Sequence, residues 1–99
     1  MMTPKNRRPI IPGEVIRQDF LEPLSISQAT LANALGVSPS AVARLLSEQS
    51  AVSPDMAVRL GHVFGTSTGY WLNLQAAVTL FDAEHSQVAK AVKALPVLV

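Results

Sequence analysis

Between Gln28 and Ser47 the sequence holds short polar side chains and one arginine, which bind other molecules through hydrogen bonds and charge. Arginine can donate two hydrogen bonds to the edge of guanine. Hydroxyl and amide groups can bind phosphate oxygens and are short enough to permit close approach. This set predicts contact with double-stranded DNA, with Arg44 as the first candidate for reading bases. The candidate residues are Gln28, Thr30, Ser38, Ser40, Ala41, Arg44 and Ser47.

Two of these residues also have simpler interpretations. Arg44 lies four residues before Glu48, so the two side chains could form an ion pair on one helix face. Arg44 could equally bind a phosphate without reading a base. Ser38 precedes Pro39 and is expected to cap a helix under any interpretation. The sequence leaves these alternatives open.

The residue types that catalysis or metal binding would need are scarce. The chain has no cysteine and only two histidines, His62 and His85, neither of which lies in a motif that supplies a partner. No glycine-rich phosphate loop occurs, and acidic residues are scattered singly. The sequence therefore predicts a protein that is not an enzyme and that uses no cofactor and no metal.

Composition and charge limit the number of domains and the cellular location, but they do not indicate a partner. The 99 residues suit one domain, and a formal net charge of +1 is small for a DNA-binding protein. Lys5, Arg7 and Arg8 form a basic arm that could follow a DNA backbone or reach a minor groove, or could simply be solvated. The N-terminus lacks the apolar stretch of a signal peptide, and the uncharged segment between Arg59 and Asp82 is interrupted by turn residues. We therefore expect a cytoplasmic protein with no membrane partner.

The elements that must position the polar residues are predicted to be helices. Helix starts carry a serine that can cap the first turn, a proline at the first helical position, or both. Glycine marks two of the helix ends, where a positive φ is needed. Frequent helix signals and poor strand signals predict an all-α fold. The predicted helices begin at Pro12-Gly13-Glu14 and end near Pro23 to Ser25, then cover 28–35, 39–47 and 54–64, with a fifth after Ser67.

The second and third helices have the spacing of a helix-turn-helix. Their apolar residues fall where two short helices that cross steeply must bury side chains. In such a motif the second helix enters the major groove and the first crosses the DNA backbone. An ordinary helical hairpin is the alternative, but the short polar groups on the outer face favour DNA. The apolar positions are Leu31, Leu35, Val37, Val42 and Leu45, with Ala32 at the close approach and Gly36 at the turn.

Two segments that flank the helix-turn-helix carry a resemblance to a known family. The first is Pro12-Gly13-Glu14-Val-Ile-Arg-Gln-Asp-Phe-Leu-Glu-Pro-Leu, and the second is Ser53-Pro54-Asp55-Met-Ala-Val-Arg-Leu followed by Gly65-Thr-Ser-Thr-Gly-Tyr-Trp-Leu-Asn-Leu-Gln75. With the helix-turn-helix, they resemble the Xre or lambda-repressor-like group and, within it, the HigA (VapI-type) antitoxin family. The resemblance spans about Ile11 to Glu84.

This resemblance implies a five-helix lambda-repressor-like domain that forms a homodimer and represses its own operon through a pseudo-palindromic operator. It also implies a partner, a HigB-like toxin that cleaves mRNA. The chain departs from the family pattern twice. Ile11 stands where the family often has histidine, and Ser47-Glu48-Gln49 replaces an Asn-Gly or Gln-Gly followed by a basic residue. The second departure brings an acid near the expected position of a phosphate.

The C-terminal part carries a long apolar stripe with alternate spacings of three and four residues. We expect its first half to pack on the domain core, with Trp71 and Tyr70 as core anchors. Beyond His85 little core remains to be covered, so residues 86–99 are predicted to form a subunit or partner interface. His85 could make that interface sensitive to pH, although a boundary position is the simpler interpretation. The stripe is Trp71, Leu74, Val78, Phe81, His85, Val88, Val92 and Leu95, and the candidate interface residues are Val88, Val92, Leu95, Val97 and Leu98.

The predicted organisation is a flexible basic arm over 1–10, a helix-turn-helix domain over 11–84 and a C-terminal helical extension over 85–99. The predicted function is a dimeric transcriptional repressor and antitoxin. A stand-alone regulator without a toxin and a protein-interaction module that no longer binds DNA are the alternatives.

Overall fold

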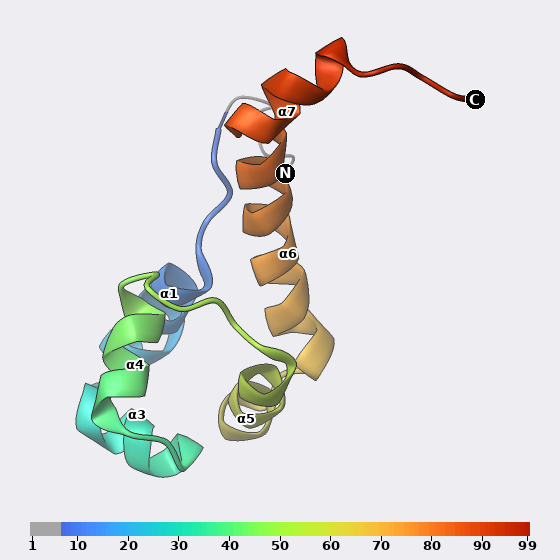
Figure 1. The fold of residues 1–99 in the computed structure, drawn as a ribbon. Coiled ribbons are helices and arrows are strands. Elements are labelled where there is room, and N and C mark those ends of the chain that lie inside the picture. Colours follow the sequence, from blue (N-terminus) through green and yellow to red (C-terminus); the bar gives the residue numbers. More distant parts are fainter. Residues whose placement is uncertain (1–6) are drawn as a thin grey trace.

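A computed structural model describes residues 7–99, and all of the regular structure in this range is helical (Figure 1). The elements are α1 (Pro12–Val15), the π-helix η1 (Ile16–Leu21), α2 (Glu22–Leu24), α3 (Gln28–Leu35), α4 (Pro39–Leu46), α5 (Pro54–Phe64), α6 (Thr68–Glu84), α7 (Gln87–Ala91) and the 3₁₀-helix η2 (Val92–Ala94). This arrangement confirms the all-α prediction, including the helical extension at the C-terminus.

The first predicted helix is interrupted by a π-helical turn. α1, η1 and α2 follow one another without a break, and the N–H of Glu22 bonds to the carbonyl of Arg17, five residues earlier. The widened turn comes directly before Pro23, which has no N–H and whose ring would crowd the carbonyl four residues earlier in a regular helix. The segment ends at Ser25, whose φ is +52°.

Serine caps begin the helices where the sequence predicts them. The hydroxyl oxygens of Ser27, Ser38, Ser53 and Ser67 each accept the backbone N–H three residues on, at 3.0–3.1 Å. Such a bond satisfies one of the N–H groups that a helix N-terminus leaves without a partner. The predicted stops are confirmed as well, because Gly36 and Gly65 have φ values of +71° and +69°.

Trp71 lies at the centre of the core. Its side chain is fully buried, and its indole N–H donates to the Thr66 hydroxyl at 2.6 Å, so the one polar atom of the ring is satisfied. Phe20 and Phe64 stack on each other with ring centroids 4.1 Å apart, and both lie about 6 Å from the Trp71 ring. The prediction that Tyr70 is a second core anchor is wrong. Tyr70 lies one residue before Trp71, so it points away from the core; it is 39% exposed and only touches the Trp71 ring with its edge.

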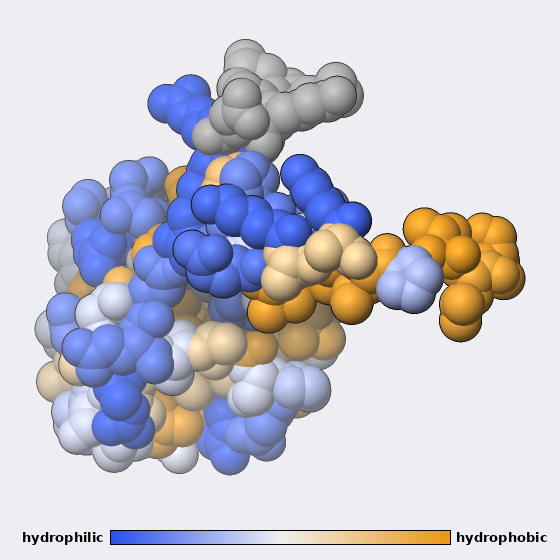
Figure 2. Space-filling model, turned by 45° about the horizontal axis from the view of Figure 1, so that its top comes forward, coloured by the Kyte–Doolittle hydropathy of each residue, from blue (hydrophilic) through white to orange (hydrophobic). Residues whose placement is uncertain are grey.

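The C-terminal part extends away from the helical domain. α6 is the longest helix, and α7 and η2 continue beyond its far end to an extended tail (Figure 1). The apolar tail stands out from the molecule in the space-filling view (Figure 2). Within residues 7–99, no helix is both long enough and apolar enough to cross a membrane.

Candidate nucleic-acid interface

α3 and α4 pack as the predicted helix-turn-helix. Leu31 and Leu35 of α3 and Val42 and Leu45 of α4 are all at most 3% exposed. Ala32 is also buried, as expected at the close approach of the two helices, and Val37 is partly buried against the core. The turn is closed by the N–H of Val37, which bonds to the Ala32 carbonyl at 3.1 Å. The apolar pattern of the sequence therefore identified the buried face of the motif.

The predicted DNA-contacting residues lie on the opposite face. All of them are exposed except Ala41, which is half-buried. Three of the hydroxyls bond locally. Ser38 caps α4, Thr30 accepts a hydrogen bond from the Ser27 hydroxyl at 2.9 Å, and Ser47 donates to the Arg44 carbonyl at 3.4 Å. The side chains of Gln28, Ser40 and Arg44 make no hydrogen bond within residues 7–99, so their polar atoms are available to a ligand.

Arg44 and Glu48 do not form the ion pair that was one alternative for Arg44. α4 ends at Leu46, and Glu48 has a φ of +68°, so its side chain no longer lies on the helix face that carries Arg44. The N–H groups of Gln49 and Ser50 return to the Arg44 carbonyl at 2.8 and 3.2 Å, which closes the helix end. The reversal of the chain therefore separates the two side chains.

Two arginines outside the motif support its helix ends. Arg59 of α5 donates from Nη1 to the Leu35 carbonyl at 2.7 Å, and its Nε donates to Asp55 at 2.9 Å. Arg17 donates to the Leu46 carbonyl at 3.2 Å. Both cations lie at helix C-termini, where carbonyl groups lack partners and the helix dipole is negative. No local spacing predicts the two carbonyl contacts, although the separation of four residues between Asp55 and Arg59 is typical of an ion pair on one helix face.

Gly13 allows the first helix to approach the end of α4. A Cβ atom at this position would lie 2.6 Å from the Leu46 carbonyl oxygen and 3.0 Å from that of Leu45. Such distances are too short for any side chain, so the glycine is required by the contact between α1 and α4.

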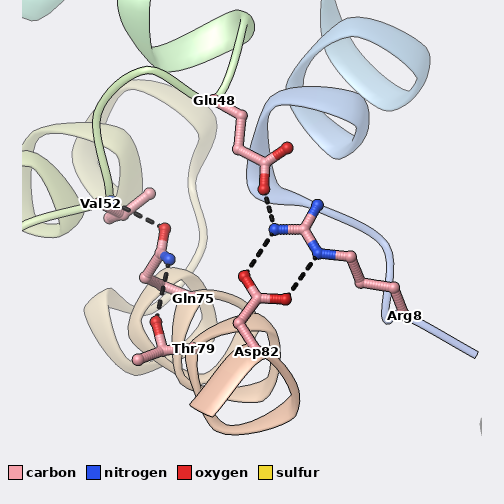
Figure 3. A network of polar contacts seen from close by, with 6 residues as sticks. All are labelled: Arg8, Glu48, Val52, Gln75, Thr79 and Asp82. Atoms are coloured by element: carbon pink, nitrogen blue, oxygen red, sulfur yellow. Dashed lines mark hydrogen bonds and ion pairs between the residues drawn. The ribbon is translucent and has the colours of Figure 1, made fainter. Parts of the chain in front are cut away.

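Arg8 joins three distant parts of the chain (Figure 3). Its Nε and Nη2 donate to the two carboxylate oxygens of Asp82 at 2.9 and 2.8 Å, and Nη2 also contacts the Glu48 carboxylate. These hydrogen bonds, together with the opposite charges, lower the pKa of Glu48 and of Asp82 and raise that of Arg8. Nearby, the Gln75 side chain accepts the Val52 N–H at 2.9 Å and donates to Thr79 at 3.2 Å.

The three cations of the predicted basic arm differ in what the structure describes of them. Arg7 is exposed, Arg8 is held by carboxylates, and Lys5 lies outside the described residues. The Arg8 contacts could not be predicted from the sequence, because no local spacing relates positions 8, 48 and 82.

The candidate interface residues of the C-terminus are exposed and lie away from the helix-turn-helix. α7 buries no residue, and its first turn is capped by Ser86, whose hydroxyl accepts the Ala89 N–H at 3.3 Å. The His85 ring stacks on Phe81 at 4.0 Å, and its Nδ1 lies 2.8 Å from the Phe81 carbonyl oxygen. The exposed apolar residues are Val88, Val92, Leu95, Val97, Leu98 and Val99.

Comparisons with known proteins extend over nearly the whole chain. A helix-turn-helix family model matches residues 18–71. Antitoxin HigA-1 of Vibrio cholerae is 36% identical over 96 residues, which cover 95% of this chain and 90% of the relative. The structure of Pseudomonas aeruginosa antitoxin HigA with the higBA promoter has a TM-score of 0.84 and 41% identity, and the match covers 93% of this chain and 100% of that one. Antitoxin GraA in complex with its operator has a TM-score of 0.83 and 38% identity, with 100% and 99% covered.

Proposed function

The chain belongs to the helix-turn-helix family of HigA-type antitoxins, and on that premise we propose that it is a dimeric, sequence-specific DNA-binding repressor of its own operon. The observation that carries this proposal is the outer face of α3 and α4. Arg44, Ser40 and Gln28 are exposed there without partners in residues 7–99, while the opposite face is buried and both helix ends are supported. The relatives solved with a promoter or an operator support the same function.

In this proposal, α4 enters the major groove and α3 crosses the backbone. Arg44 donates to a guanine edge, and Ser40 lies one helical turn before it on the exposed face. Gln28, the first residue of α3, binds a phosphate with help from the helix N-terminus. Thr30, Ser38, Ala41 and Ser47 complete the contact surface, and Arg7 approaches the backbone of the DNA.

The test is binding to the DNA upstream of the protein's own gene, measured at several salt concentrations. Arg44→Ala should lose about 1–3 kcal/mol of binding free energy for the specific site and little for unrelated DNA. Lys90→Ala is the matched control, because it removes the same charge from exposed α7. Equal losses for the two variants would mean that Arg44 contributes only charge. If the wild type binds no better to this site than to unrelated DNA, the protein is an interaction module.

The C-terminal surface is the proposed dimer contact. Val88, Val92 and Leu95 are exposed on α7, on η2 and directly after η2, and Val97 and Leu98 are exposed on the tail beyond them. Burial against a second copy would remove an exposed apolar surface that is otherwise a liability. A dimer would place two α4 helices about one DNA turn apart, roughly 34–36 Å, which predicts a pseudo-palindromic operator.

The second proposed partner is a HigB-like toxin that cleaves mRNA. The support for this partner is the antitoxin relatives and the resemblance that the flanking segments carry. The chain would act in the cytoplasm by binding and would catalyse no reaction. A neighbouring gene for a small basic ribonuclease-like protein, and co-purification of its product with this chain, would distinguish an antitoxin from a stand-alone regulator.

A further inference from the structure

Glu48 places a negative charge beside the proposed DNA-binding surface, where a negative charge does not favour binding to phosphates. It follows α4 after a single residue, its side chain is 39% exposed, and its backbone lies in the left-handed region. Ser47, next to Glu48 in the chain, belongs to the proposed contact surface, so a carboxylate at position 48 places a negative charge near the DNA backbone once α4 is docked. Like charges repel, and the repulsion is strongest at low salt, so an uncompensated Glu48 would weaken DNA binding.

Arg8 compensates this charge. The guanidinium contacts the Glu48 carboxylate and forms a two-point contact with Asp82 of α6 at 2.8 and 2.9 Å (Figure 3). A two-point contact fixes the orientation of the guanidinium plane as well as its distance. Asp82 therefore holds Arg8 in place against the turn that follows α4.

The same contacts argue against a direct role of Arg8 on DNA. Its Nε and Nη2 already donate to carboxylates, and the cluster of one cation and two anions carries a formal charge of −1. Binding a phosphate through Nε or Nη2 would mean breaking these hydrogen bonds, and the net negative charge of the cluster disfavours a phosphate at Nη1 as well. Arg7, the neighbouring cation, is exposed and has no such contacts within residues 7–99.

We propose that Arg8 is a positioning residue for the DNA-binding surface, which neutralises and holds Glu48 at the end of α4 and does not itself bind phosphate. This role rests on the proposed DNA-binding function. The two proposals can be tested separately. The proposed function predicts the affinity for DNA, whereas the role of Arg8 predicts how the effects of substitutions at positions 8 and 48 on that affinity depend on each other.

The experiment is a double-mutant cycle on binding to the DNA upstream of the protein's own gene, with Arg8→Ala, Glu48→Gln and the double variant. At low salt, Arg8→Ala should bind about two- to fivefold more weakly than the wild type, the size expected for an exposed charge cluster. Glu48→Gln should bind at least as tightly as the wild type, and adding Arg8→Ala to it should cause no further loss. Arg8→Lys should recover part of the affinity because it restores the charge without the two-point contact.

The control is Arg7→Ala, which removes the same charge from the adjacent position. Its effect on affinity should be the same in the wild type and in the Glu48→Gln variant. Thermal unfolding of each variant separates binding from folding. If Arg8 supported only the fold, Glu48→Gln would break the same contact and would weaken binding as Arg8→Ala does.

Three results would overturn the proposal. The first is an equal loss from Arg8→Ala with and without Glu48, which would mean a direct phosphate contact. The second is a loss of affinity on Glu48→Gln alone, and the third is no effect of Arg8→Ala while the wild type binds the DNA. Failure of the wild type to bind this DNA specifically would instead reject the proposed function, and the role of Arg8 with it.

Discussion

The helix-turn-helix and the C-terminal extension share the same local helix signals, but the first is packed into the core and the second is exposed. α4 and α7 both begin at a serine cap, and both segments have apolar residues four positions apart, Val42 and Leu46 in α4 and Val88 and Val92 in α7 and η2. α4 buries Val42, Leu45 and Leu46, whereas α7 buries none of its residues. Capping and spacing therefore determine that a helix forms, while the neighbours of that helix determine whether its apolar face becomes core. α1 and α3 supply those neighbours for α4, and within residues 7–99 nothing supplies them for the tail.

The largest expected difference is in the cost of deleting an apolar side chain. Leu31→Ala should lower the free energy of unfolding by about 2–5 kcal/mol, because Leu31 is only 1% exposed and its removal leaves a cavity. Leu95→Ala removes the same atoms from a position that is 62% exposed, and it should change this free energy by less than about 0.5 kcal/mol in dilute protein. Urea unfolding measures both. Comparable losses for the two variants would mean that the tail is part of the same core as α3, and that the C-terminal extension does not differ from the helix-turn-helix in burial.

The second prediction concerns assembly. Val88→Asp should weaken the dimer at least about tenfold, since a charge placed in an apolar contact loses its hydration without gaining a partner. Leu80→Asp is the matched control, because Leu80 is 59% exposed on α6 and lies outside the proposed interface. Sedimentation at several protein concentrations measures the dimer affinity. A larger effect from Leu80→Asp would move the interface onto α6.

The smallest expected difference is between two serine caps. Ser38→Ala should cost about 1 kcal/mol of folding free energy, because the lost cap begins a helix that is packed into the core. Ser86→Ala should leave global unfolding nearly unchanged, since α7 can lose its structure without exposing a buried residue. Chemical denaturation measures the first effect and hydrogen exchange of the α7 amides the second. A global effect of Ser86→Ala would show that α7 unfolds together with the domain.

The features that the sequence predicts correctly depend on interactions between residues close in the chain. Serine caps, glycine stops and the spacing of Leu31, Leu35, Val42 and Leu45 depend on residues close in the chain, and the structure confirms all of them. The face that carries Arg44 and Ser40 followed from the same periodicity. Local pattern alone was therefore enough to predict the fold class and the exposed face of the candidate site.

The contacts that were missed join distant positions. Arg59 with Leu35, Arg17 with Leu46, and Arg8 with Asp82 are separated by 24, 29 and 74 residues. No periodicity relates such positions, because their proximity is a result of tertiary packing. The prediction that Tyr70 lies in the core is wrong for a different reason. Two adjacent aromatic residues on a helix point in different directions, so the burial of Trp71 leaves Tyr70 directed away from the core.

The absence of a side chain at Gly13 has a consequence for how the protein folds. The end of α4 is completed by a contact with a residue 33 positions earlier, at a place where even a methyl group would collide with the Leu46 carbonyl. A loop of that length must close before the contact forms, and this loss of chain entropy is recovered only when the other core residues pack at the same time. The helix-turn-helix is therefore not a module that could be excised and transplanted as residues 27–47. We expect its final geometry to depend on the docking of the N-terminal helix, because α1 packs against the end of α4.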